Sequence, residues 1–172
     1  NTLRSLSDAA LQNALAPPLR HGVLRYTSAT EQQVHADERL LHYLVFADEE
    51  EPYFDATRAA VEASAERYGN QLLHLVVPRT EAAVLSYFGV SAHQLPTAVI
   101  SNLTSGIVNY RFDEQQPRKS FEASTAVAFA ADFFAGELQR HVRSVPPPPD
   151  TERRAGVAPL VGSTFRRRAV DT

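Results

Sequence analysis

The stretch of sequence that decides the fold runs from Leu72 to Phe112 and reads LLHLVVPRTEAAVLSYFGVSAHQLPTAVISNLTSGIVNYRF. Its unbroken apolar run, Leu72–Val77, predicts a central strand that is covered on both faces of a sheet. A short helix should follow, because Thr80 can cap its first turn and Gly89 can end it in the left-handed conformation. An X-Pro turn and a hairpin come next, since residues 102–106 separate two apolar runs as a hairpin loop does.

The rest of the chain supplies the other elements of an α/β fold. Proline near the first turn of a helix and glycine after its last turn are start and stop signals. One further helix carries both signals, and the last helix carries the glycine. We therefore predict a mixed sheet of four or five strands with helices on both faces. The expected elements are strands at Gly22–Thr27 and Leu40–Phe46, a short helix within Glu31–Arg39, a helix between Pro52 and Gly69, and a last helix at Phe121–Ala135 that Gly136 ends.

The composition is that of a globular protein without thiol chemistry. The chain has 172 residues, of which 44% are hydrophobic, and this indicates one domain with a sizeable core plus appendages. Its net charge of −3 predicts no nucleic-acid or membrane partner, and no apolar run approaches the roughly 18 residues that span a bilayer. Without cysteine there is no disulfide, thiolate nucleophile or zinc–cysteine site. We expect no cofactor and no bound metal. Because no signal peptide and no retrieval tetrapeptide are seen, we also expect a fragment of a longer chain.

Several short segments, taken in order, resemble the protein disulfide isomerase family. Tyr87–Val90, followed by Pro96 and a hairpin, is similar to the second half of a thioredoxin-like domain. His42–Phe46 is similar to the central strand of that domain and Phe129–Glu137 to its last helix. Val161–Phe165 resembles the opening strand of the catalytic a′ domain that follows in those enzymes. The resemblance covers roughly residues 15–171. Within the family, the segments are most similar to the non-catalytic b′ domain.

This resemblance implies a thioredoxin-like fold and a division of the chain into four parts. These are an entry helix or the tail of a preceding domain at 1–17, a b′-like domain at 18–143, a proline-rich linker at 144–156, and the truncated first strand of a following domain at 157–172. The implied location is the lumen of the endoplasmic reticulum. The chain itself has no catalytic site, whereas the implied parent protein is a protein disulfide isomerase.

The resemblance also implies a function, which is to bind unfolded or misfolded polypeptide clients. The binding groove would lie between the first helix and the helix at residues 80–88, with Val84 at its centre. Pro96 matches the cis-proline of the family. The candidate peptide-binding residues are Val84, Tyr87, Phe88, Leu40, Tyr43 and Phe46.

Two other functional classes are considered. One is a redox-inactive chaperone or adaptor of the endoplasmic reticulum that recruits other folding factors. The other is a calcium-binding thioredoxin-like protein such as calsequestrin, which the balanced charge opposes, because weak calcium stores need a dense acidic surface.

Two groups of polar residues admit both a structural and a functional interpretation. Glu49–Glu51 precede a predicted helix, which indicates an interaction with the helix dipole, and they lack the spacing of a calcium loop. In catalytic thioredoxin domains this position carries Cys-x-x-Cys, and this chain has no thiol there. His42 and His74 lie on the two buried strands, either as buried, hydrogen-bonded histidines or as an incomplete pair of metal ligands.

The remaining candidate features lie in a turn, in the last helix and in the tail. Asn102 opens a glycosylation sequon. The phenylalanines of the last helix cover more than one stripe, so either a second face is covered or single side chains are exposed. Pro146–Pro149 predict an extended spacer, with a ligand for a proline-recognising groove as the alternative. The apolar residues of Val157–Phe165 favour docking, either on the chain's own groove or on a second copy as a weak homodimer, and Arg166–Arg168 are expected to be solvated.

Overall fold

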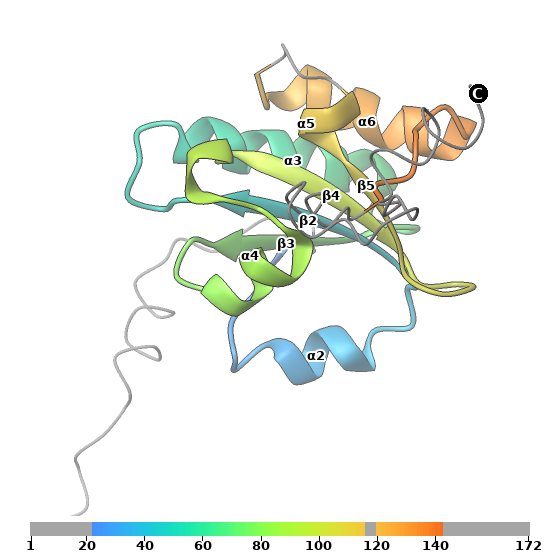
Figure 1. Cartoon of the computed structure of the whole chain (residues 1–172), viewed down its shortest axis with the longest axis horizontal. Helices are drawn as coiled ribbons and strands as arrows, with labels where there is room; N and C mark the ends of the chain where they lie inside the picture. The colour runs from blue at the N-terminus through green and yellow to red at the C-terminus, as the bar shows by residue number, and fades with distance from the viewer. Residues whose placement is uncertain (1–21, 116–119, 143–172) are drawn as a thin grey trace, which may run out of the picture.

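The computed structural model describes residues 22–115 and 120–142, which form an α/β domain (Figure 1). Strands and helices alternate through the first two thirds of these residues, and a hairpin and two helices complete them. In chain order the elements are β1 (Leu24–Arg25), α2 (Glu31–Ala36), β2 (Leu41–Ala47), α3 (Phe54–Tyr68), β3 (Leu73–Pro78), α4 (Ala82–Phe88), a 3-10 turn (Ala92–Gln94), β4 (Thr97–Asn102), β5 (Val108–Arg111), α5 (Phe112–Gln115) and α6 (Ala123–Ala135).

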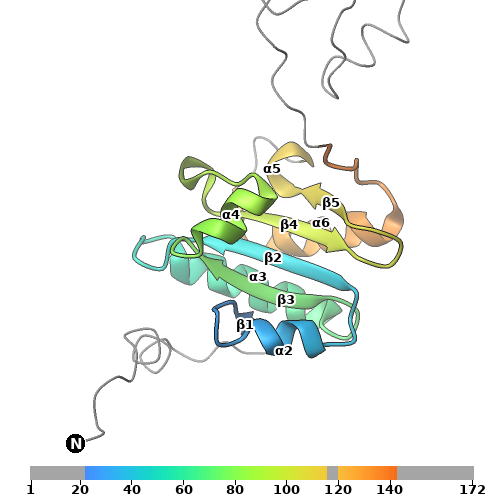
Figure 2. The same cartoon turned by 60° about the horizontal axis from the view of Figure 1, so that its bottom comes forward.

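The five strands form one mixed sheet in the order β1-β3-β2-β4-β5. Strands β1, β3 and β2 are parallel to one another, and β4 and β5 each run antiparallel to the strand before them in this order. Helices α3, α5 and α6 cover one face of the sheet, whereas α2 and α4 lie on the other (Figures 1 and 2). The predicted fold class is confirmed, because the central strands β2 and β3 are buried on both faces as their apolar runs required.

The face of the sheet under α3 and α6 holds the larger core. Tyr43 of β2 points into it, and its hydroxyl donates a hydrogen bond to the carbonyl of Ala126 on α6, 3.1 Å away. Its ring lies 5.8 Å, centroid to centroid, from that of Phe129. The other principal members are Val45, Val61, Leu72, Val76, Ile100, Phe112 and Phe121.

The opposite face, under α2 and α4, holds a second core. Strand residues alternate between the faces, so Leu44 and Phe46 point here while Tyr43 and Val45 do not. Val34 of α2 and Leu85 of α4 close this core on the side away from the sheet. Its other buried members are Leu73, Leu75, Val77, Val90 and Val99. We call this side of the domain the α2–α4 face.

The ends of the helices follow the predicted stop signals more closely than the predicted start signals. Gly89 ends α4 and Gly136 ends α6, both with positive φ, at 66° and 74°. The prediction that Thr80 caps α4 is wrong, because the helix begins at Ala82 and the capping position is Glu81. There the amide of Ala82 bonds to the backbone carbonyl of Thr80, at 2.9 Å, and no side chain caps the helix.

Several sequence predictions concern residues that the structure does not describe. The entry helix or domain tail at 1–17, the linker at 144–156 and the strand at 157–172 lie outside residues 22–115 and 120–142, as do Pro146–Pro149 and Arg166–Arg168. The domain boundaries at 18 and 143 therefore stay predictions.

Candidate functional site

Helix α4 presents three apolar side chains on one side, and they define the candidate site. Val84, Tyr87 and Phe88 are spaced three and four residues apart, which places them together on a helix. Val84 and Phe88 are half-buried against the core of the α2–α4 face, whereas Tyr87 is 54% exposed. The rings of Tyr87 and Phe88 meet edge to face, 5.0 Å apart. The side of α4 nearest the core therefore continues into an aromatic surface that solvent reaches.

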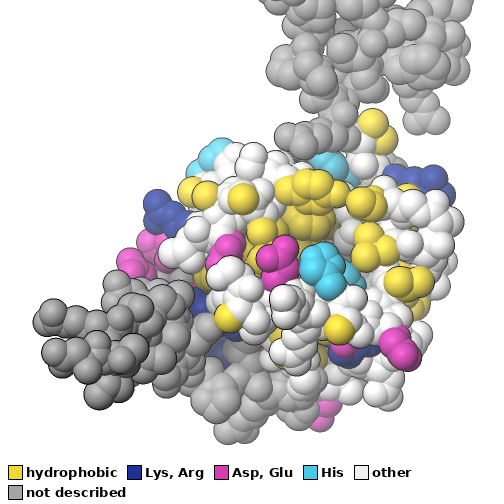
Figure 3. Space-filling model, turned by 90° about the horizontal axis from the view of Figure 1, so that it is seen from below, with side chains coloured by type: hydrophobic (Ala, Val, Ile, Leu, Met, Phe, Trp, Pro, Cys, Tyr) yellow, Lys and Arg dark blue, Asp and Glu magenta, His cyan; other side chains and the backbone are white. Residues whose placement is uncertain are grey.

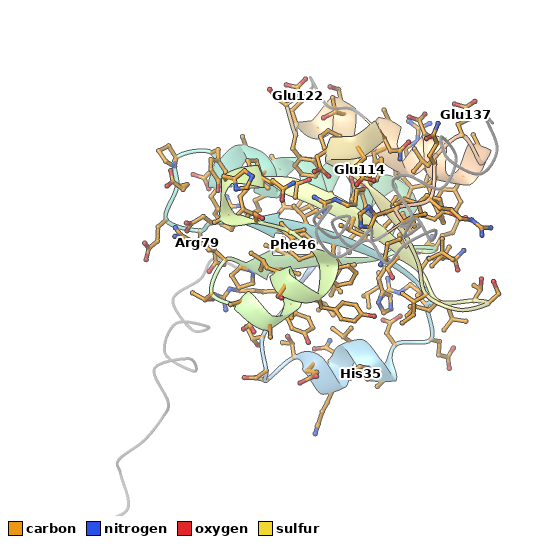
Figure 4. The ribbon with its side chains drawn as sticks, in the orientation of Figure 1. His35, Phe46, Arg79, Glu114, Glu122 and Glu137 are labelled. Carbon is orange, nitrogen blue, oxygen red and sulfur yellow. The ribbon has the colours of Figure 1, made fainter. Side chains whose placement is uncertain are left out.

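Phe46 supports this surface from the side of the sheet. Its ring lies 5.6 Å from that of Phe88, and Figure 4 shows it between the sheet and α4. The sequence analysis named Phe46 as a candidate floor residue, and the structure brings its ring to that of Phe88. Helix α2 contributes Val34 to the same core. Seen from this side, apolar side chains gather in a hollow, with acidic and histidine side chains beside it (Figure 3).

Two of the predicted floor residues lie elsewhere. Tyr43 is fully buried on the opposite face of the sheet, so its placement in the groove is wrong. Leu40 is 50% exposed and comes just before β2. It lies at the end of β2 that pairs with Asn102, whereas Phe46 lies at the other end and pairs with Thr97. The structure therefore separates Leu40 from the cluster around α4 along the length of the strand.

The floor also contains residues that the sequence prediction omitted. Leu44 and Val99 are register partners and both belong to the core of the α2–α4 face. Residues two apart on a strand share a face, so the choice of Phe46 should have led to Leu44 and excluded Tyr43. The alternation was present in the sequence and was the signal that could have found them.

The loop before α3 carries four consecutive carboxylates at residues 48–51, and two arginines pair with the first two of them. Arg79 donates from Nη1 to Asp48 Oδ2 at 2.8 Å and lowers the pKa of that carboxyl (Figure 4). Arg25 holds Glu49 through two hydrogen bonds, of 2.7 and 2.5 Å. Glu49 is therefore paired with an arginine of β1, and the interaction of Glu49–Glu51 with the dipole of α3 stays a prediction. Among the described residues, no group of three or more histidines and carboxylates could hold a metal ion.

The two strand histidines point to opposite faces of the sheet. His74 pairs in register with Tyr43, and His42 pairs with Leu73, so their rings cannot share a metal ion. His74 is buried and bonded to Ser64 Oγ and to the carbonyl of Leu72, each at 3.0 Å. His42 is half-buried, with Nε2 3.1 Å from the carbonyl of Arg39. Burial lowers the pKa of both, and that of His74 falls to about 4. The interpretation as a buried, hydrogen-bonded histidine agrees with the geometry of His74, whereas His42 is hydrogen-bonded but only half-buried.

Two further predicted residues flank β4. The Leu95–Pro96 peptide bond is cis, as the resemblance implied. Asn102 ends the strand, and its Oδ1 accepts hydrogen bonds from the amide and the hydroxyl of Thr104, at 2.9 and 2.7 Å. The first of these residues lies close to α4 in the chain, whereas the second lies at the hairpin.

Comparison with known proteins agrees with this fold. The sequence profile of the family described as "Thioredoxin-like domain" matches residues 20–123. Human protein disulfide-isomerase A2 is 28% identical over 151 residues, which cover 87% of this chain and 28% of that protein, so the chain spans less than a third of that relative. A crystal structure of human ERp44 superposes with a TM-score of 0.52 at 13% identity, over 88% of this chain and 36% of that one. The bb fragment of ERp72 gives 0.50 at 17% identity, over 78% and 58%.

Of the helices within the described ranges, none is both long and apolar enough to cross a bilayer.

Proposed function

The chain belongs to the thioredoxin-like domains of the protein disulfide isomerase family, and from this premise we propose that it binds unfolded polypeptide without catalysing thiol exchange. It would act as a b′-like, substrate-binding domain of a larger isomerase in the lumen of the endoplasmic reticulum. Its clients are unfolded or misfolded chains, which expose the apolar side chains that a folded protein buries. Thiol exchange itself requires a thiolate, and the chain has no cysteine.

The observation that carries the proposal is the uncharged side of α4. The helix contains no acidic or basic residue, and Tyr87 stands half-exposed above a half-buried Val84 and Phe88. A large exposed aromatic beside a recessed apolar floor is the pattern of a binding surface, since Tyr gives contact area at a low cost in conformational entropy. Because such a surface buries little area, we expect affinities that are micromolar or weaker.

The experiment places a charge at the centre of the surface. Val84→Asp should abolish binding of a fluorescently labelled, reduced and carboxymethylated lactalbumin, a permanently unfolded probe, because a carboxylate would have to be desolvated on contact. Ala83→Asp is the matched control, since residue 83 is exposed on the same helix and accepts the same charge. Circular dichroism would establish that both variants keep the fold. If Val84→Asp binds the probe as tightly as Ala83→Asp does, the site lies elsewhere.

A second candidate function is that of an adaptor, and one observation on the α3–α6 side favours it. Phe134 of α6 is 39% exposed and stacks on Tyr68 of α3, with ring centroids 5.4 Å apart. Phe133 beside it is held by Tyr110, so only part of the stripe is covered within the described residues. A folding factor could bind to this aromatic pair. Phe134→Ser should then weaken capture of such a factor and leave binding of the unfolded probe unchanged.

A further inference from the structure

A buried arginine joins the end of α4 to the edge of the sheet. Arg111 closes β5, and its side chain is only 6% exposed. Its Nη1 donates to the carbonyl of Gly89 at 2.8 Å, while Nε and Nη2 bond to the two carboxylate oxygens of Asp113, at 3.0 and 2.7 Å. Glu114 adds a longer contact, 3.9 Å from Nε. Arg111 pairs in register with Val99, so it lies on the α2–α4 face.

The same ion pair also holds the segment that follows α4. Gln94 donates from Nε2 to Asp113 Oδ2 at 3.1 Å, and its own Oε1 accepts from the amide of Ser91 at 2.8 Å. Both ends of the connection between Gly89 and Gln94 are thus tied to one arginine–carboxylate pair. A partly buried ion pair of this kind contributes little to stability by itself, because desolvation of the arginine offsets its attraction to Asp113. Its directional hydrogen bonds nevertheless determine where the connected backbone lies.

Helix α4 depends on such a directional contact. It has only seven residues, and its other contacts with the core are apolar. They are made by Val84, Leu85 and Phe88, and by Val90 just after the helix. Apolar contacts are not directional, so by themselves they leave the rotation of a two-turn helix weakly specified. The bond to Gly89 fixes the backbone one and two residues after Phe88 and Tyr87, the side chains of the candidate surface.

We propose that Arg111 is a positioning residue that sets the orientation of α4 and thereby the affinity of the surface formed by Val84, Tyr87 and Phe88 for unfolded polypeptide. This inference rests on the proposed function. Arg111 does not touch the polypeptide. It acts through the Gly89 carbonyl, and Asp113 keeps the buried guanidinium paired.

The chain contains a matched control for this arrangement. Arg39 bonds to both oxygens of Asp37, two residues away, at 2.7 and 2.5 Å, and its Nη1 donates to the carbonyl of Gly69 at 2.6 Å. Gly69 is the residue after the last turn of α3, so the same three groups are joined at the end of a different helix. Removing this second pair perturbs the fold through similar chemistry without touching α4.

The experiment compares two double variants, Arg111→Met with Asp113→Asn, and Arg39→Met with Asp37→Asn, so that no carboxylate is left unpaired. With the carboxymethylated lactalbumin probe, the first should bind about tenfold more weakly, a loss within the range expected for a hydrogen bond to a charged group. Amide hydrogen exchange at Gly89 and Val90 should accelerate, because α4 loses its tether, while exchange in β2 and β3 stays slow. The second variant should bind the probe like the unmodified chain.

Four outcomes decide between these interpretations. Weaker binding together with faster exchange at Gly89 and Val90, in the first variant alone, supports the inference. Unchanged affinity in that variant overturns it, provided that Val84→Asp still abolishes binding. If Val84→Asp has no effect either, the proposed function fails and not the role of Arg111 alone. Equal losses of affinity in both double variants would also overturn the inference, since they would reflect a general effect on stability.

Discussion

His74 Nε2 lies 3.0 Å from Ser64 Oγ in the core between β3 and α3. The other ring nitrogen, Nδ1, faces the carbonyl of Leu72, which can only accept a hydrogen bond. Nδ1 therefore carries the proton, and Nε2 accepts from the Ser64 hydroxyl. A neutral imidazole satisfies both hydrogen-bond partners. A second ring proton would point at Ser64 and place a positive charge in a buried site, which is unfavourable.

The stability of the domain should consequently fall in mild acid. Burial lowers the pKa of His74 from 6.5 to about 4, so between these values the unfolded chain binds a proton that the folded chain does not. The free energy of unfolding therefore rises with pH across this window, by roughly 1.4 kcal/mol per pH unit. The total gain that His74 contributes is about 3 kcal/mol. Above pH 6.5 its contribution is complete and constant.

Urea unfolding between pH 4 and 7 checks this expectation. His74→Gln should flatten the dependence on pH relative to the unmodified chain, because an amide can also donate to Leu72 and accept from Ser64 without titrating. His35→Gln, a change at an exposed position of α2, should leave the slope in place. A His74→Gln variant with the slope of the unmodified chain would show that another group carries it.

Tyr43→Phe should reduce stability and leave peptide affinity unchanged. The substitution removes the hydroxyl that donates to Ala126, so a loss of about 0.5–1.5 kcal/mol is expected. Because Tyr43 lies on the α3–α6 face, the surface on α4 is unaffected. Denaturant midpoints and titration with the unfolded probe measure the two effects separately. A loss of affinity without a loss of stability would restore Tyr43 to the binding site.

Thr97→Val should stabilise the domain. Thr97 is 1% exposed, and its Oγ1 is buried without a hydrogen-bond partner. Valine has nearly the same shape and has no hydroxyl to desolvate, so a gain of about 1 kcal/mol is expected. Thr57→Val is the contrasting control, because Thr57 Oγ1 bonds to the carbonyl of Tyr53 at 3.1 Å and its removal should cost stability. If Thr97→Val is destabilising in thermal unfolding, the hydroxyl has a partner in solution, such as a buried water.

Asn102 should carry a glycan when the chain is produced in a secretory pathway. The sequon lies where β4 ends, and Thr104 in the following loop is exposed. Digestion with an N-glycosidase should increase the electrophoretic mobility of the secreted protein. The shift should vanish in Thr104→Ala, which removes the sequon but keeps Asn102, and should persist in Thr104→Ser. Absence of a shift in the unmodified chain would exclude the modification.

Most of the helices and strands, and their order, follow from local signals in the sequence, whereas α5 and the 3-10 turn were not predicted. Two apolar runs specified β2 and β3 as buried strands, and Gly89 and Gly136 marked the ends of α4 and α6, because these signals are local in the chain. The cis bond at Pro96 was also expected, although through the family resemblance, since the base rate of cis bonds would not have suggested it.

The orientation of the strands relative to α4 came from the structure alone. The alternation of side chains places Tyr43 and Phe46 on opposite faces, but a strand that is apolar on both sides carries no sequence signal for which face meets α4, and the structure puts Phe46 there. Arg111 was not among the predicted site residues for a related reason. Arg111 bonds to Gly89, 22 residues away in the chain, and its partner Asp113 bonds to Gln94, 19 residues away. Only the pairing of β5 with β4 brings these residues together. Contacts between distant segments depend on how the sheet is assembled, and no local pattern records that.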